Sequence, residues 1–295
     1  MLKKNLINLI THWCPSNILS RDGNAKKFCL IVLNQPINHV DAFHRLWSNG
    51  KVHINNMSKH PKLNFLWNGI ATYKFVADGG SNRLYDAFKH DQEALAQYIP
   101  DEIRGDLDSI RPDVRAYYES KSVKITKVSD QDSTDFMKCV ALLSEKEKER
   151  GQIFDIVATP ALGGRFDQTI ASINMLYMLK DEIERRFILV SDENLTMLLD
   201  KGTHQIHCQL DLEGPTCGVM PIGSPATLTT KGLKWDMGKE SRQRQIAMSL
   251  IVPLLDNLKC EFGGMVSTSN AVDSDLVEIV TDAPVVWTIE INLLK

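Results

Sequence analysis

The chain has 295 residues, of which 43% are hydrophobic and 24% charged, and its formal net charge is -3. This length and composition are ordinary for a soluble protein with two domains, and the charge gives no basic face for nucleic acid. No run reaches the roughly 20 apolar residues of a membrane helix, so we expect a cytoplasmic protein without a membrane partner. The six cysteines form no CxxC pair, so we expect reduced, buried thiols rather than a zinc site or disulfides.

Residues 1–25 are expected to form a separate N-terminal segment that is either frayed or docked on the folded domains. Its first part, Met1–Arg21, lacks acidic side chains and carries Lys3 and Lys4, which faintly resembles a mitochondrial presequence. With a single Arg and three hydroxyl side chains, however, the segment fits a frayed or docked terminus better than a targeting signal.

Strand-like and helix-like segments alternate from residue 26 to residue 194. The short apolar runs that indicate buried strands are Phe28–Leu33, Lys74–Ala77, Val123–Val128, Ile153–Ala158 and Phe187–Val190. The segments with helical spacing of apolar residues are Asn82–Phe88, Ser133–Lys148 and Phe166–Leu179. This alternation predicts an α/β domain whose parallel sheet is covered on both faces. Weak periodicity marks residues 48–69 as a surface insertion.

The pattern changes in residues 195–295, where helical periodicity nearly vanishes. Short strand-like runs replace it, and glycine and proline separate them. The runs are Leu195–Leu199, His204–Cys208, Gly218–Pro221, Ala226–Thr230, Val277–Val280 and Val285–Ile291. Such a series is typical of an antiparallel β-sandwich. The sequence therefore predicts an N-terminal α/β domain followed by a C-terminal β-sandwich.

Two polar clusters lie in strand-to-helix connections, where parallel sheets bind ligands. In Asp78–Asn82, two glycines let backbone N–H groups approach an anion, although a tight turn capped by Ser81 or Asn82 explains this cluster better by itself. In Gly105–Ser109, Asp106 and Asp108 project to the same side if the segment is extended, an arrangement that suits Mg²⁺. A turn or a helix cap at Asp108 or Ser109 is the alternative.

Two further clusters precede the next helices. In Asp130–Asp135, a helix cap explains one of Asp132, Ser133 and Thr134 but not the whole polar run. Asp135 either sits in the first helical turn or completes a metal site with Asp106 and Asp108. In Gly163–Gln168, the guanidinium of Arg165 suits a phosphate, and Asp167 either orients it or caps the helix. The alternative for Arg165 is a solvated side chain on a loop.

Familiar phosphate-binding and nucleophile motifs are missing from the sequence. It contains no Walker A pattern, no kinase catalytic loop and no GxSxG elbow. If the protein handles phosphates, carboxylates with Mg²⁺ and Arg165 must do so. In the β-rich part, Thr230–Asp236 resembles a hairpin that presents Trp235 beside a carboxylate, and Val266–Asn270 is a polar run. A core tryptophan and a plain loop are the alternatives.

Together these clusters resemble the eukaryotic thiamine pyrophosphokinase family. The matching motifs are LNQP at 33–36, ADGGSNRLYD at 77–86, GDLDSIRP at 105–112, DQDSTDF at 130–136, GGRFDQ at 163–168, GLKW at 232–235 and VSTSN at 266–270. Each motif alone is weak or moderate, but seven in family order are highly specific. The departures are the length of residues 48–69 and the leading segment, and neither contains a motif.

The resemblance implies a homodimer whose active sites are shared between subunits. The implied reaction converts ATP and thiamine into AMP and thiamine diphosphate with Mg²⁺. The implied metal ligands or metal-site organisers are Asp106, Asp108 and Asp135. The sequence shows no obvious general base, and Asp135 and Asp132 are the two candidates for it. The residues that would line the nucleotide and diphosphate site are Asp78, Gly79, Gly80, Ser81, Asn82, Gln131, Arg165 and Asp167. The residues that would hold thiamine, from the other subunit, are Trp235, Ser267, Ser269 and Asn270.

Two other functions compete with this interpretation. One is a diphosphotransferase or phosphohydrolase that acts on another small alcohol, which would differ in the residues around Trp235. The other is a non-catalytic thiamine- or nucleotide-binding module. Such a module would tolerate loss of the acidic residues, yet Asp106, Asp108 and Asp135 are all present.

Overall fold

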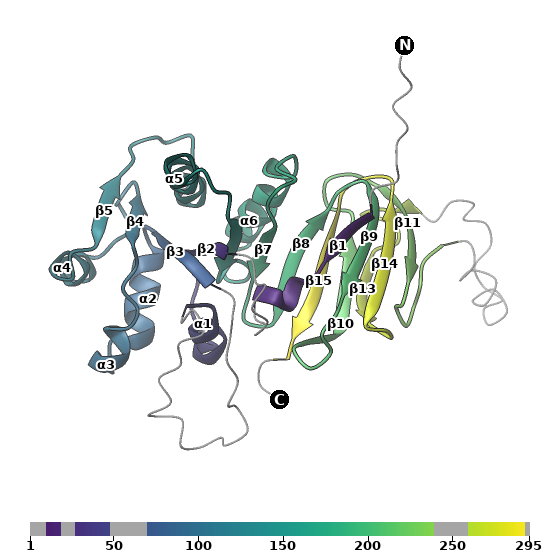
Figure 1. Cartoon of the computed structure of the whole chain (residues 1–295), viewed down its shortest axis with the longest axis horizontal. Coiled ribbons are helices and arrows are strands. Elements are labelled where there is room, and N and C mark those ends of the chain that lie inside the picture. The colour runs from purple at the N-terminus through teal and green to yellow at the C-terminus, as the bar shows by residue number, and fades with distance from the viewer. Residues whose placement is uncertain (1–9, 19–26, 48–69, 239–258, 293–295) are drawn as a thin grey trace, which may run out of the picture. The chain divides into compact units, whose positions relative to one another are not determined.

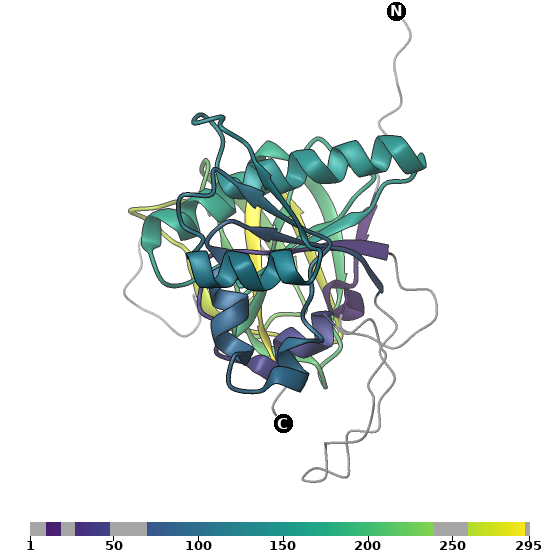
Figure 2. The same ribbon diagram turned by 90° about the vertical axis from the view of Figure 1, so that its left-hand side faces the viewer.

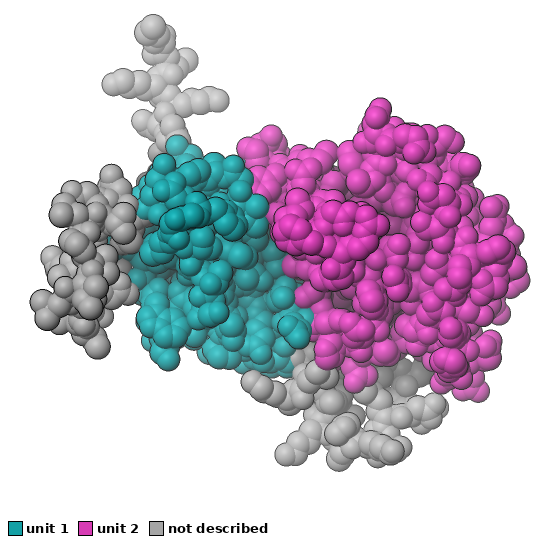
Figure 3. Space-filling model, turned by 180° about the vertical axis from the view of Figure 1, so that it is seen from behind, with its two compact units in different colours: residues 1–16, 193–295 teal, residues 17–192 magenta. Residues whose placement is uncertain are grey.

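The computed structural model describes residues 10–18, 27–47, 70–238 and 259–292 (Figure 1). The chain divides into two compact units, coloured separately in Figure 3. Unit 1 comprises residues 1–16 and 193–295, and unit 2 comprises residues 17–192. The expected insertion at residues 48–69 lies outside the described residues.

Unit 2 contains a parallel sheet with the strand order β7-β6-β2-β3-β4-β5. The strands are β2 (Lys27–Val32), β3 (Ile70–Ala77), β4 (Glu102–Gly105), β5 (Lys124–Lys127), β6 (Asp155–Thr159) and β7 (Phe187–Val190). Strand β2 lies in the middle, and its residues from Phe28 to Val32 are at most 1% exposed. A continuous apolar run suits this place because both faces of the strand are covered.

Helices cover both faces of this sheet, as the sequence predicts. They are α1 (Val40–Trp47), α2 (Gly80–Phe88), α3 (Gln92–Leu95), α4 (Pro112–Ser120), α5 (Asp135–Arg150) and α6 (Phe166–Met178). Helix α5 packs on one face, and α1 and α2 lie on the opposite face (Figures 1 and 2). Helix α5 ends at Gly151, whose left-handed backbone (φ 63°) forms the C-cap.

Unit 1 is built from two sheets with the orders β1-β9-β14-β11-β12 and β13-β10-β15-β8. The strands are β1 (Ile10–Trp13), β8 (Asn194–Leu199), β9 (Gly202–His207), β10 (Glu213–Met220), β11 (Ala226–Lys231), β12 (Lys259–Cys260), β13 (Ser267–Ala271), β14 (Leu276–Thr281) and β15 (Val285–Ile291). The pairs are antiparallel except β1 with β9. Alternate residues of β11 are buried, which is the pattern of a sandwich strand.

Part of the N-terminal segment is docked, which is one of its two expected alternatives, and one cysteine departs from the expected burial. Strand β1 pairs with β9 through Ile10 to Trp13, so this part of the N-terminal segment belongs to the fold of unit 1. All six cysteines lie in the described residues, where none forms a disulfide, and five are buried, but Cys14 directly after β1 is exposed. Within the described residues, no helix is both long enough and apolar enough to cross a membrane.

Candidate active site

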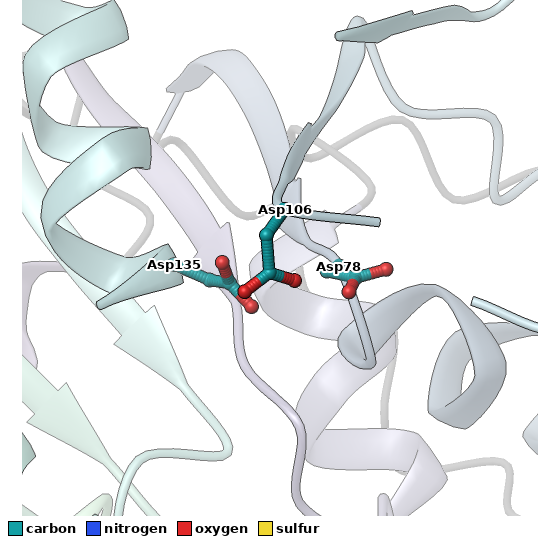
Figure 4. Close-up of side chains that lie close together, drawn as sticks. All are labelled: Asp78, Asp106 and Asp135. Atoms are coloured by element: carbon teal, nitrogen blue, oxygen red, sulfur yellow. The ribbon is translucent and has the colours of Figure 1, made fainter. Parts of the chain in front are cut away.

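Three carboxylates meet at one edge of the parallel sheet in unit 2. Asp78 follows β3, Asp106 follows β4, and Asp135 begins α5, which comes after β5. Because these strands are neighbours and run in the same direction, their carboxyl ends bring the three residues to one place. One carboxylate oxygen from each residue lies within 4.8 Å of the others (Figure 4). Asp78 is buried, whereas Asp106 and Asp135 are partly exposed.

Gly105, the last residue of β4, makes this close approach possible. A Cβ atom at this position would overlap the Cβ of Asp78 and lie 2.9 Å from Oδ1 of Asp135. Ordinary van der Waals contact begins at 3.4 Å, so any larger residue must push the carboxylates apart. The need for glycine therefore comes from the approach of two side chains, since the backbone here is not left-handed.

Asp78 is held in a fixed orientation by the loop after β4. The N–H groups of Ser109 and Ile110 donate to its two oxygens, each over 2.9 Å. Burial raises the pKa of Asp78 to about 6, the N–H group of Ser109 opposes this shift, and the charge of Asp135 adds to it. Asp78 is thus the buried member of the cluster, and backbone hydrogen bonds orient both of its oxygens.

Lys138 is a charged partner of the cluster that the sequence analysis missed. Its Nζ lies 3.2 Å from Oδ1 of Asp135 and 3.9 Å from Oδ2 of Asp106, and its side chain is only 3% exposed. Burial raises the pKa of Asp135, and the hydrogen bond from Lys138 opposes that shift. The spacing of Asp135 and Lys138, three residues apart on a predicted helix, was the available signal.

Asp108 lies outside this cluster, which is a correction to the expected geometry. The segment after β4 is not extended, because Leu107 has a left-handed backbone with φ 62°. Asp106 and Asp108 therefore do not project as alternate residues of a strand. The N–H group of Asp108 donates to Oδ1 of Asp106 over 3.3 Å, and its carboxylate accepts from the hydroxyl of Ser109 over 2.8 Å. A metal role for Asp108 stays a prediction, which Asp108→Asn would test.

The glycine turn after β3 is tied together by its own side chains. The hydroxyl of Ser81 donates to the carbonyl of Asp78 over 2.6 Å and is buried. The amide of Asn82 donates to the carbonyl of Ser109 and accepts from the N–H group of Arg111. A Cβ at Gly80 would lie 2.7 Å from the carbonyl oxygen of Val32, so the helix starts directly against β2.

The loop before α5 and the turn before α6 are exposed. Thr134 is the residue that caps α5, and its hydroxyl accepts from the N–H group of Met137 over 3.2 Å. Gln131 and Asp132 are exposed in that loop. Arg165 is also exposed and forms two contacts with Asp167, of 3.1 Å through Nε and 2.6 Å through Nη2. This pairing raises the pKa of Arg165, and it fits the expectation that Asp167 orients the guanidinium.

A second group of predicted residues gathers within unit 1. The buried side chain of Asn270 accepts from the N–H group of Trp235 over 3.2 Å and donates to its carbonyl over 3.0 Å. It also donates to the hydroxyl of Ser267 over 3.2 Å. Trp235 is 49% exposed, and the ammonium of Lys234 lies 4.8 Å from its ring centroid. Trp235 is therefore a surface side chain and not part of the core. Ser269 on β13 is also exposed, and its backbone is left-handed with φ 55°.

Comparisons with known proteins cover both units. Residues 64–187 match the family model described as thiamin pyrophosphokinase, catalytic domain, and residues 203–286 match its vitamin B1 binding domain. Thiamine pyrophosphokinase 3 of Oryza sativa subsp. japonica is 36% identical and thiamine pyrophosphokinase 1 of Arabidopsis thaliana is 37% identical. Each alignment covers 90% of this chain and 87% of the relative.

A solved structure agrees with these sequence relatives. The crystal structure of yeast thiamin pyrophosphokinase superposes with a TM-score of 0.74 at 26% identity, covering 98% of this chain and 94% of that chain. Both domain models match in order, and the relatives extend over nearly the whole chain. The chain therefore belongs to the thiamine pyrophosphokinase family.

Proposed function

We propose that this thiamine pyrophosphokinase transfers a diphosphate group from ATP to the hydroxyl of thiamine, releasing AMP and thiamine diphosphate. The observation that carries the proposal is the meeting of Asp78, Asp106 and Asp135 at the carboxyl edge of the parallel sheet. Parallel sheets bind ligands at this edge, and polyphosphates are commonly bound there together with a divalent cation. The match of residues 203–286 to a vitamin B1 binding domain supports thiamine as the acceptor.

Mg²⁺ fits the donor set of this cluster. Carboxylate oxygens are the hard ligands that Mg²⁺ prefers, and in an octahedral site at about 2.1 Å they lie about 3–4.2 Å apart. The three carboxylate oxygens within 4.8 Å of one another are close to this spacing. We propose that Asp78, Asp106 and Asp135 hold the metal, with Asp108 as a further candidate from the family motif. Bound there, Mg²⁺ would neutralise phosphate charge and orient the nucleotide.

The protein's own groups then mainly position the reactants. The hydroxyl oxygen of thiamine would attack the β-phosphorus in line with the leaving AMP, through a loose transition state. Arg165, paired with Asp167 at the start of α6, supplies a planar cation suited to phosphate oxygens. Gly79, Gly80, Ser81, Asn82 and Gln131 are the remaining nucleotide-site candidates. Asp132 is an exposed candidate for the base that accepts the hydroxyl proton, and Asp135 is the alternative.

Trp235 is the best candidate for recognition of the thiamine ring. It is half-exposed, its backbone is fixed by Asn270, and its ring already attracts the cationic side chain of Lys234. The thiazolium of thiamine is also a cation, so the same aromatic face suits it. Ser267 and Ser269 on β13 would contribute polar contacts to the same ligand.

The direct test follows the products. Incubation of the purified protein with ATP, Mg²⁺ and thiamine should yield AMP and thiamine diphosphate in equal amounts. Formation of ADP would refute attack at the β-phosphorus. Turnover of ATP with another small alcohol but not with thiamine would favour the broader diphosphotransferase or phosphohydrolase. Binding of ATP and thiamine without any product would make the chain a non-catalytic module.

We also propose, from the family resemblance, a homodimer whose sites are shared between subunits. A two-fold dimer would contain two such sites, each combining the acidic cluster of one chain with Trp235 of the other. Asp106→Asn chains mixed with Trp235→Ala chains should then regain activity after subunit exchange, because some sites receive both unaltered residues. Proven heterodimers without recovered activity would show that each site is built within a single chain.

A further inference from the structure

Lys138 is a buried cation in an unfavourable place. Its side chain is 3% exposed, and the transfer of an ammonium group out of water is strongly unfavourable unless it is paired. It is also the fourth residue of α5, which begins at Asp135. The N-terminal end of a helix carries partial positive charge, so a cation in the first turns is further disfavoured.

The carboxylates of the cluster are what offset these two effects. The Nζ of Lys138 lies 3.2 Å from Asp135 and 3.9 Å from Asp106, and the charge of Asp130 acts on it from farther away. Asp106 and Asp135 are also two of the three residues whose oxygens converge in the candidate metal site. An ammonium group and a divalent cation would therefore compete for the same carboxylates.

We propose that Lys138 is the internal counter-ion of the acidic cluster, which stabilises the metal-free protein and weakens its affinity for a divalent cation. This inference rests on the proposed metal site at Asp78, Asp106 and Asp135. The ammonium neutralises part of the negative charge when the metal is absent, and it repels the metal when the metal is present. A site tuned in this way releases its cation readily.

Lys146 on the same helix provides a matched control. It pairs with Glu149, three residues further on, over 2.8 Å, just as Lys138 pairs with Asp135. Its side chain is 31% exposed, and its partner is not part of the cluster. Lys146→Met removes the same charge and a similar ion pair from α5 without touching the candidate site.

The test measures metal binding directly, with Mn²⁺ as the probe. Calorimetric titration of the metal-free protein should give a Kd for Lys138→Met and Lys138→Gln that is at least about tenfold lower than for the unaltered protein. In EDTA, both variants should have a lower melting temperature than the unaltered protein. On addition of Mg²⁺, the melting temperature of each variant should rise by more than that of the unaltered protein. Lys138→Arg, which keeps the charge, and Lys146→Met should retain the original Kd.

Each result decides between the proposals. Tighter Mn²⁺ binding by both neutral variants, with Lys138→Arg unchanged, supports the counter-ion role. An unchanged or weaker affinity in Lys138→Gln overturns that role and leaves the metal site standing. Failure of every protein, including the unaltered one, to bind Mn²⁺ overturns the metal site and the counter-ion role together.

Discussion

Gly105→Ala is the substitution that most directly tests the geometry of the acidic cluster. It adds a single methyl group at the end of β4, where a Cβ would overlap the Cβ of Asp78 and stand 2.9 Å from Oδ1 of Asp135. The carboxylate of Asp135 must retreat by about 0.5 Å to restore a contact of 3.4 Å. Asp78 has less freedom, because two backbone N–H groups hold its oxygens at 2.9 Å.

The structure sets the size of the expected effect. An extra methyl group in a packed region typically destabilises a protein by about 1–3 kcal/mol, which lowers the thermal midpoint by several degrees. Displacement of catalytic groups by about 1 Å can slow an enzyme about 10²-fold. We therefore expect Gly105→Ala to lower kcat/KM by about 10- to 100-fold while the protein stays folded at room temperature. Its affinity for Mn²⁺ should fall as well, because the three carboxylates no longer converge.

Gly151→Ala is the control that separates an effect of lost stability from an effect of a distorted acidic cluster. Gly151 ends α5 with φ 63°, so alanine there is strained by about 1 kcal/mol, but a Cβ meets nothing within 4 Å. Steady-state kinetics with ATP and thiamine, Mn²⁺ calorimetry and thermal melting are to be run on both variants. If Gly105→Ala keeps normal kcat/KM and metal affinity, or loses activity only as much as Gly151→Ala does, the close packing around Gly105 does not shape the site.

Three further predictions concern single side chains in both units. Asp106→Asn should lower kcat roughly 10²-fold through lost charge stabilisation, and near-normal turnover at saturating Mg²⁺ would remove it from the metal site. Trp235→Ala should raise KM for thiamine much more than it lowers kcat, since a cation–π contact supplies only about 0.5–2 kcal/mol; an unchanged KM would exclude ring recognition. Burial raises the pKa of Glu213 from 4.5 to about 7, so the stability that this group supplies is complete below pH 4.5 and is lost as the pH rises to about 7. Glu213→Gln should remove this pH-dependent loss of stability, which amounts to roughly 3 kcal/mol. Thermal melting at about pH 5 and pH 8 measures it. If the variant loses as much stability between these two pH values as the unaltered protein does, Glu213 is not the group responsible.

The elements that sequence reasoning predicts well are those with strong apolar patterns. Strand β15 has the expected bounds of Val285–Ile291, and β7 those of Phe187–Val190, because both are nearly continuous runs of apolar residues. Strand β4 cannot be recognised from the sequence, because Ile103 is its only large apolar residue between Glu102 and Gly105. Strand β13 is missed for the same reason, because an edge strand made mainly of Ser, Thr and Asn has the composition of a loop.

The acidic cluster shows a similar division. Its location at strand ends, and the pairing of Asp106 with Asp135, follow from the alternation of strands and helices. The expected third member is Asp108, because an extended backbone after Gly105 would place it beside Asp106. The left-handed backbone of Leu107 directs Asp108 elsewhere, and Asp78 is the third member instead. Asp78 reaches the cluster only because β3 and β4 are neighbours, and this adjacency is a property of the sheet order.

The charges described around the proposed nucleotide site support the proposed role of a metal in binding a polyphosphate. The chain has a net charge of -3, so it does not attract an anion overall. Arg165 is already paired with Asp167, and Lys138 with Asp135 and Asp106. The positive charge of each side chain is therefore partly neutralised by a carboxylate of the same chain. Asp78 adds another carboxyl group to the same cluster. The three carboxylates of the cluster outnumber the ammonium group of Lys138 that contacts two of them, and a divalent cation bound there would reverse that balance. In the proposed site, carboxylates that would repel the nucleotide in the absence of metal would thus be the groups that hold it, through the metal, once the metal is bound.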